Sequence, residues 1–168
     1  MSTTTDAAAA IRATLKAKGI SSRAVSVRTD YYSMGSAIRI EVKDPTVSLA
    51  MVEDLASQHE QIQRDGWGEI LGGGNRYVTA RYSAAAAAAI RAAYRGVVAA
   101  AVATWATASE NSLIPVAGTP FFLGRSHHGD ALTLWSDHHL GSAHDVDSLA
   151  ELIGTKLGGI QAGGGIHD

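Results

Sequence analysis

The sequence predicts an α+β fold. An antiparallel sheet layer with the element order α-β-β-α-β packs on a long alanine-rich helix, and a C-terminal β-hairpin and helix follow. Three observations predict it. Residues 22–43 alternate between apolar and polar side chains, which is typical of a half-buried hairpin. Apolar residues at helical spacing flank this region. Between Ser83 and Ser109 only Arg91 and Arg95 are charged, which indicates a long apolar helix.

The first helix is expected over about residues 6–18. Thr5 or Asp6 can cap its N-terminus, and Gly19 suits its C-terminal end. The two strands of the hairpin come next, and the apolar side chains of each strand share one face.

A second helix is expected after the turn at Asp44, ending near Arg64, and a third strand over residues 76–82 joins the hairpin. The glycine loop at residues 72–75 offers backbone amides for an anion, but it precedes a strand and lacks a phosphate-loop lysine. A turn that needs positive φ is the preferred interpretation. We therefore treat residues 1–82 as one α+β module.

Residues 83–157 are expected to form the second part of the chain. Ser83 caps a helix that runs to about Ala108. Small residues line one of its sides, and they form a hypothetical dimer seam: Ala92, Gly96, Ala99, Ala103 and Ala106. The alternative is that the alanine runs reflect a GC-rich genome and high helix propensity.

The C-terminal hairpin is predicted from two apolar runs, residues 121–123 and 131–135, on either side of a turn at residues 126–130. Asp145 or Asp147 then caps a final helix that ends at Leu157. Residues 158–168 are glycine-rich, and we expect a flexible tail.

Composition narrows the classes of function. The 168 residues contain no cysteine, which excludes disulfides and thiolate metal sites, and the N-terminus lacks a secretion signal. We expect a cytoplasmic protein with no membrane partner, because the uncharged stretch from Gly96 to Ser109 is shorter than a bilayer span. Residues 1–95 carry 12 Lys and Arg against 9 Asp and Glu, whereas residues 96–168 carry 2 against 7. The first half permits nucleic-acid binding, but only weakly.

Arginine and tyrosine side chains alternate outward on the predicted sheet and at the end of its hairpin. The candidate partner-binding or nucleic-acid-binding residues are Arg28, Tyr31, Tyr32, Arg39, Lys43, Tyr77 and Arg81. Arginine and tyrosine anchor protein interfaces, and they also grip phosphates and stack on bases. A solvated face partly covered by the C-terminal region is the third interpretation.

Histidine and aspartate gather after residue 126, which raises the question of a metal site. The weak candidates are His138, His139, His144 and Asp145. No recognised ligand spacing supports them, and His127 would lie at the opposite end of the hairpin. No activated nucleophile is evident either. We therefore expect no cofactor and no enzymatic activity.

Parts of residues 10–82 resemble a known family. They are the strand at residues 26–28, the connection at residues 32–36 and the glycine loop with its strand at residues 68–78. Together they resemble the twenty-ninth of the large polyvalent protein associated domains, a module of bacteriophages and mobile elements. The family's Asp-Gly-Pro turn is only Asp44-Pro45 here. The resemblance implies an accessory role in entry, against host defences or around the element's own DNA, and it supplies no catalytic residue.

Three functions follow in order of preference. The first is a non-enzymatic phage or mobile-element protein that binds a host protein in counter-defence, with a homodimer through the alanine helix as a second partnership. The alternative is a nucleic-acid-binding accessory factor that uses the Arg/Tyr face. The last is a metal-dependent enzyme that uses the C-terminal His and Asp residues.

Overall fold

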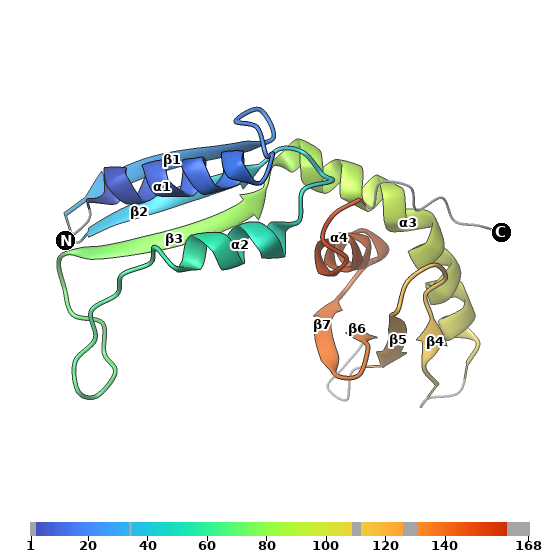
Figure 1. Ribbon diagram of the computed structural model, residues 1–168. Helices are drawn as coiled ribbons and strands as arrows, with labels where there is room; N and C mark the ends of the chain where they lie inside the picture. The colour runs from blue at the N-terminus through green and yellow to red at the C-terminus, as the bar shows by residue number, and fades with distance from the viewer. Residues whose placement is uncertain (1–2, 34, 109–111, 126–130, 161–168) are drawn as a thin grey trace. The chain divides into compact units, whose positions relative to one another are not determined.

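The computed structural model describes residues 3–33, 35–108, 112–125 and 131–160. The chain divides into two compact units, Met1–Ala86 and Ala87–Asp168 (Figure 1). The predicted α+β class is confirmed, because the described residues form four helices, a three-stranded sheet and a four-stranded sheet.

The first helix, α1 (Thr4–Ala17), begins two residues earlier than predicted. Thr3 rather than Thr5 or Asp6 is its N-cap. The Thr3 hydroxyl accepts a hydrogen bond from the Asp6 amide at 3.1 Å, and the Asp6 carboxylate accepts one from the Thr3 amide at 3.0 Å. This reciprocal pair is a capping box, so Asp6 serves at the third helical position. Gly19 ends the helix as predicted, with φ of 79°.

Three strands form the first sheet in the order β1-β2-β3: β1 (Val25–Tyr32), β2 (Gly35–Val42) and β3 (Asn75–Tyr82). The hairpin β1-β2 is antiparallel, as predicted, but β3 runs parallel to β2, so the sheet is mixed rather than antiparallel throughout. The reason is the connection between them. The helix α2 (Leu49–Ser57) carries the chain back along the sheet, and such a crossover places the two strands in parallel.

The second helix is shorter than predicted. Ser48 caps α2 by accepting a hydrogen bond from the Met51 amide, and the helix ends at Ser57 instead of near Arg64. Gln61 exchanges two backbone hydrogen bonds with Arg76, at 2.9 and 2.7 Å, which draws the chain away from a helical path. In the glycine loop that follows, Gly73 and Gly74 both have positive φ, as the turn interpretation predicts.

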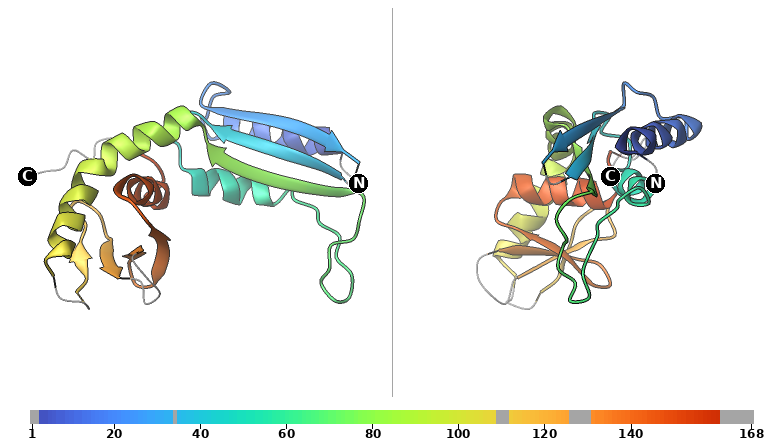
Figure 2. Two further views of the ribbon diagram at one scale, coloured as in Figure 1. Left: turned by 180° about the vertical axis from the view of Figure 1, so that it is seen from behind. Right: turned by 90° about the vertical axis from the view of Figure 1, so that its left-hand side faces the viewer.

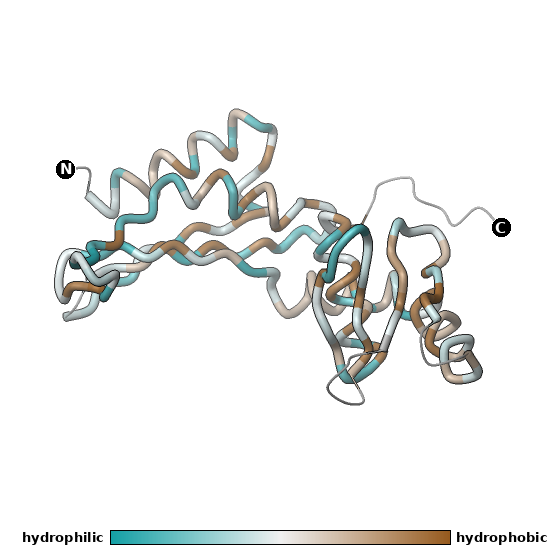
Figure 3. Tube along the Cα trace, turned by 90° about the horizontal axis from the view of Figure 1, so that it is seen from below, coloured by the Kyte–Doolittle hydropathy of each residue, from teal (hydrophilic) through white to brown (hydrophobic). Residues whose placement is uncertain are grey.

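Both α1 and α2 cover the same face of the first sheet, and the left view of Figure 2 looks onto the other, uncovered face. Hydrophobic and hydrophilic residues alternate along the strands (Figure 3). Among the described residues, the helices that pack on this sheet within the first unit are therefore α1 and α2, not the long alanine-rich helix. The core between the helices and the sheet includes Ala7, Ala8, Ile11, Leu15, Val25, Val27, Ile38, Ile40, Val42, Leu49, Val52, Leu55 and Ala56.

The second unit combines an antiparallel sheet with two helices. Its strands, in the order β4-β5-β6-β7, are β4 (Ile114–Pro115), β5 (Phe122–Arg125), β6 (Leu132–Trp135) and β7 (His139–Ala143). The predicted hairpin is confirmed as β5 and β6, and β4 and β7 extend it on either side. The predicted turn at residues 126–130 and residues 161–168 of the predicted tail lie outside the described residues.

The long helix α3 (Ala84–Ala106) packs on α4 (Val146–Lys156). The predicted caps are confirmed: the Ser83 hydroxyl accepts from the Ala86 amide, and the Asp145 carboxylate from the Ser148 amide. Where the helices approach, Gly154 of α4 lies against Ile90 and Tyr94 of α3.

By length and composition alone, α3 is apolar enough to cross a membrane, with a mean hydropathy of 1.4 over 18 residues. The 18-residue window lies in a helix of 23 residues. The expectation of no membrane partner was based only on the shorter uncharged stretch from Gly96 to Ser109. A mostly buried core helix of a soluble protein passes the same test; α3 contributes Val98 and Ala101 to the core of the second unit, but only 28% of the apolar window is buried. The absence of a membrane partner stays a prediction.

Candidate functional site

The uncovered face of the first sheet gathers most of the predicted binding residues. The pairing registers place their side chains in rows across the three strands. Arg28 lies opposite Arg39, whose neighbour on β3 is Thr79. The outward side chains are Ser26, Arg28, Asp30, Tyr32, Ala37, Arg39, Glu41, Tyr77, Thr79 and Arg81, and this set is called the open face below.

Charges of both signs meet on the open face. The Arg39 guanidinium pairs with the Asp30 carboxylate, with 2.6 Å between Nε and Oδ2, and both side chains are about half exposed or more. Among the described residues, no ion pair or hydrogen bond holds the guanidinium of Arg28 or of Arg81. Three arginines against two carboxylates leave one net positive charge. Such a surface suits a partner with mixed polarity better than a polyanion.

The structure separates two predicted residues, Tyr31 and Lys43, from this group. Tyr32 lies on the open face, and its hydroxyl donates to the Ser36 carbonyl at 3.2 Å. Tyr31 points to the opposite side, where its hydroxyl is hydrogen-bonded to Thr5 of α1 at 2.9 Å, because adjacent strand residues point to opposite faces. Lys43 is exposed one residue beyond the end of β2, outside the open face. The face is therefore smaller than the predicted set.

The five residues of the hypothetical dimer seam, residues 92, 96, 99, 103 and 106, are all exposed on α3. The apolar stripe on the other side of the helix faces the interior: Ile90 and Val98 are fully buried, and Tyr94 and Trp105 are partly buried. The seam is thus an uncovered strip of small side chains within the second unit. Its role in dimerisation stays a prediction.

The candidate metal ligands His138, His139, His144 and Asp145 each make separate local contacts or face solvent in the described structure. Within the residues that the structure describes, no group of three or more His, Asp or Glu side chains could hold a metal ion. His138 bonds to Asp137 at 2.6 Å, and His139 bonds to Ser142 at 3.2 Å. His144 is exposed, and the Asp145 carboxylate caps α4.

Local hydrogen bonds also lower the pKa values of two carboxyl groups in this region, those of Asp145 and Asp137. The backbone amide and then the hydroxyl of Ser148 hold the pKa of Asp145 below its ordinary value. The Ser136 hydroxyl, followed by His138, lowers the pKa of Asp137. Both carboxylates are therefore ionised at neutral pH, and both are engaged in structural contacts.

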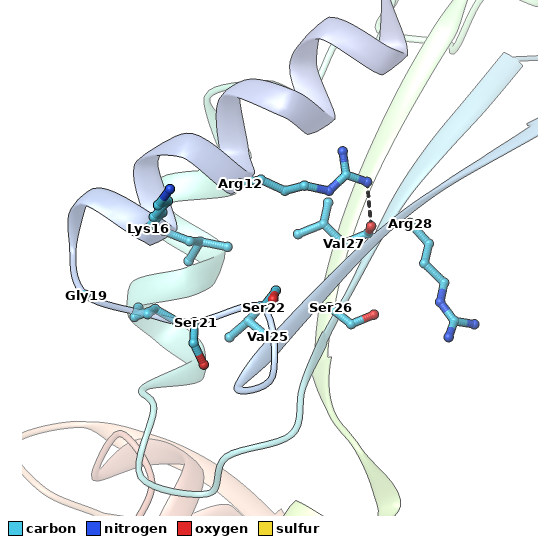
Figure 4. Close-up of a pocket in the computed structure, with 11 residues that line it drawn as sticks. Arg12, Lys16, Gly19, Ser21, Ser22, Val25, Ser26, Val27 and Arg28 are labelled. Carbon is cyan, nitrogen blue, oxygen red and sulfur yellow. Dashed lines mark hydrogen bonds between the residues drawn. The ribbon is translucent and has the colours of Figure 1, made fainter.

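One surface of the first unit was not predicted from the sequence. A groove of about 720 Å³ lies between α1 and the outer edge of β1 (Figure 4). Arg12 and Lys16 stand on its helical side, and Val25 and Val27 on its strand side. The available signal was the spacing of Arg12 and Lys16, which places two cations on one side of α1 without an acidic partner.

No family model matches this chain, and no curated protein or solved structure is significantly similar to it. The resemblance to the polyvalent protein associated module therefore stays a prediction from the sequence.

Proposed function

We propose that this chain is a non-enzymatic accessory protein whose first unit binds a partner protein through the open face. The observation that supports the proposal most is the pair Arg28 and Arg39, which lie directly opposite each other on neighbouring strands. Like charges in that position destabilise a sheet. Asp30 neutralises one of them, and the other has no partner among the described residues. A bound carboxylate would relieve the repulsion.

The kind of partner follows from the mixture of side chains. Arginine and tyrosine are enriched where protein interfaces bury most of their binding energy. Asp30 and Glu41 suit a protein partner that carries basic groups as well. In the setting suggested by the family resemblance, this partner is a host protein and the role is counter-defence. That part of the proposal rests on the resemblance alone.

A photo-cross-linking experiment tests the open face. A photoreactive amino acid replaces Thr79, which is exposed in the middle of the face, and in a matched control it replaces Glu53, which is exposed on α2. In a cell extract, we expect a discrete nuclease-resistant protein adduct from position 79 only. The double reversal Arg28→Glu and Arg81→Glu should abolish it. An equal adduct from position 53, or one indifferent to the charge reversal, contradicts the proposal.

Nucleic-acid binding is the second candidate function, because the open face combines arginines with Tyr32 and Tyr77. At most three arginines can meet phosphates, so log affinity for single strands should fall with log salt at a slope no steeper than about 2. Fluorescence anisotropy with a labelled single-stranded oligonucleotide measures this slope. Tight binding that persists at physiological salt would favour this second function over the first.

The homodimer is a separate proposal. We propose that two copies meet through the exposed small residues of α3, because small side chains let helix backbones approach closely. Size exclusion with light scattering at two salt concentrations should show a dimer whose absorbance ratio indicates no nucleic acid. Ala99→Glu should yield a monomer, whereas Ala13→Glu on the exposed side of α1 should not. A wild-type monomer at both salt concentrations rules out the seam.

A further inference from the structure

The groove between α1 and β1 has a well-defined end. The chain leaves α1 through a Schellman motif: the Ile20 amide donates to the Leu15 carbonyl at 2.9 Å, and the Gly19 amide donates to the Lys16 carbonyl at 3.0 Å. This turn closes the groove at one end and places Ile20 in its lining. The groove therefore has an apolar end, a helical wall and a strand wall (Figure 4).

The strand wall is the outer edge of the sheet. In the strand order, β1 is terminal, so among the described residues no strand pairs with its outer side. The Lys43 amide donates to the Ala24 carbonyl at 2.7 Å, which makes these two residues a hydrogen-bonded pair. Such pairs alternate along an antiparallel hairpin, so the backbone groups of Val25 and Val27 point outward to the edge.

Two of these outward backbone groups already form hydrogen bonds within the chain. The Val25 amide donates to the Ser21 carbonyl at 3.1 Å, and the Val27 carbonyl accepts from the Arg12 guanidinium at 2.7 Å. Within the described part of the chain, the Val25 carbonyl and the Val27 amide have no hydrogen-bond partner. The two residues are 3% and 9% exposed, and both line the groove. They lie on either side of Ser26. In parallel pairing, one residue of a neighbouring strand donates to the first of two such groups and accepts from the second.

The charge of the groove is one-sided. Arg12, Lys16 and Arg28 contribute to its lining, and none of the lining residues is acidic. Arg28 lies on the far side of β1, whereas Arg12 and Lys16 stand on α1 above the groove (Figure 4). One N–H of Arg12 is bonded to Val27, and no carboxylate among the described residues pairs with the rest. The guanidinium thus offers further donors to an anion.

We propose that the groove binds an extended acidic segment of a partner protein, which adds to the edge of β1 as a parallel strand. One residue of this segment bonds to the Val25 carbonyl and the Val27 amide. An acidic side chain binds Arg12 and Lys16, and an apolar side chain packs on Ile20. Strand addition of this kind draws affinity from the backbone and specificity from the side-chain pockets. A nucleic acid lacks the backbone amides that this edge requires.

Ser26 and Arg28 line both surfaces, but the two sites use different binding groups, because the groove's backbone groups point to the sheet edge and the cations that bind the acidic side chain, Arg12 and Lys16, lie on α1. Either proposal can therefore fail without the other. The photo-cross-linker at position 79 tests binding at the open face, and the NMR resonance of the Val27 amide tests binding in the groove.

The test is selection from a displayed library of random peptides about 12 residues long, with the full chain as bait. We expect enrichment of Asp and Glu among β-forming residues. The best synthetic peptide should shift the amide resonance of Val27 in an ¹⁵N-correlated NMR spectrum. Blocking the paired peptide amide by N-methylation should weaken binding about two- to tenfold, which is the loss expected for one backbone hydrogen bond.

Charge-reversed variants complete the test. Arg12→Glu and Lys16→Glu should each weaken the peptide at least about tenfold. Lys18→Glu is the matched control, because it changes the net charge equally but lies outside the groove. An unchanged NMR spectrum for the remaining amides establishes that each variant is folded. Any of three results overturns the proposal: no enrichment of acidic residues in the selected peptides, unchanged peptide affinity in Arg12→Glu, or no shift of the Val27 amide resonance on peptide binding.

Discussion

The contact between α3 and α4 allows a sharp comparison of two glycines in helices. A Cβ on Gly154 would clash with Cγ2 of Ile90 and lie 2.9 and 3.0 Å from two ring carbons of Tyr94. A Cβ on Gly96 would meet no atom within 4 Å. The change from glycine to alanine therefore has the same helix-propensity term at both sites but a steric term at only one.

The expected magnitudes follow from these two terms. Alanine in place of glycine stabilises a helix by about 1 kcal/mol, so Gly96→Ala should raise the free energy of unfolding by that amount. At Gly154 the same gain is opposed by overpacking, which costs about 1–3 kcal/mol. Ile90 is fully buried and has no room to move, so the upper end applies. The net loss for Gly154→Ala is then about 2 kcal/mol.

Urea unfolding monitored by tryptophan fluorescence measures both values. Trp105 and Trp135 are partly buried in the second unit, whereas Trp67 of the first unit is 94% exposed and changes little on unfolding. The midpoint for Gly154→Ala should fall by about 1–2 M. The measurement is made at low protein concentration, so that a dimer formed through α3 does not add to the measured stability. A midpoint at or above that of the unmodified protein would refute the close contact.

A second substitution separates steric strain from any other cause. Ile90→Ala alone should destabilise the unit by about 2–5 kcal/mol. It also removes the atom that clashes with the new methyl group. The double variant should therefore be more stable than the sum of the single effects predicts, by at least about 1 kcal/mol. Strict additivity would show that the two residues do not touch.

Three further predictions concern other parts of the fold. Asn75→Ala removes the acceptor for the Gln63 amide and the donor to the Leu71 carbonyl, and it should lower the stability of the first unit by about 1–3 kcal/mol, measured by circular dichroism. Gly35→Ala should destabilise the same unit, because φ is 151° and a Cβ would clash with the Asn75 carbonyl; an unchanged melting temperature would contradict this. The pKa of Asp145 is lowered in the folded state, so the cap on α4 is present above the ordinary carboxyl value of about 4 and is lost as pH falls through the folded value. Asp145→Asn keeps a cap that does not titrate, and its stability should therefore fall less than that of the original chain in acid; parallel pH profiles would show that the carboxylate is not responsible.

Local patterns predicted most elements well because their causes are local. Ser83 and Asp145 each cap a helix through an amide three residues away, and alternation marked the hairpin β1-β2. The first cap was misplaced because Thr3 and Asp6 act as a reciprocal pair, and only the backbone path distinguishes that pair from Thr5. The end of α2 was misplaced because the pairing of Gln61 with Arg76 is not encoded in helical periodicity.

The candidate sites likewise have some features that local sequence patterns predict and others that depend on tertiary packing. Strand residues alternate with a period of two, and this alternation predicted that Arg28, Arg39, Tyr77 and Arg81 share a face. The packing of distant segments leaves this face uncovered in its unit, brings Tyr31 to α1 and makes β3 run parallel to β2. The same packing places α1 along the edge of β1 and thereby forms the groove. These outcomes depend on packing between segments far apart in the chain, which no local pattern of residues specifies.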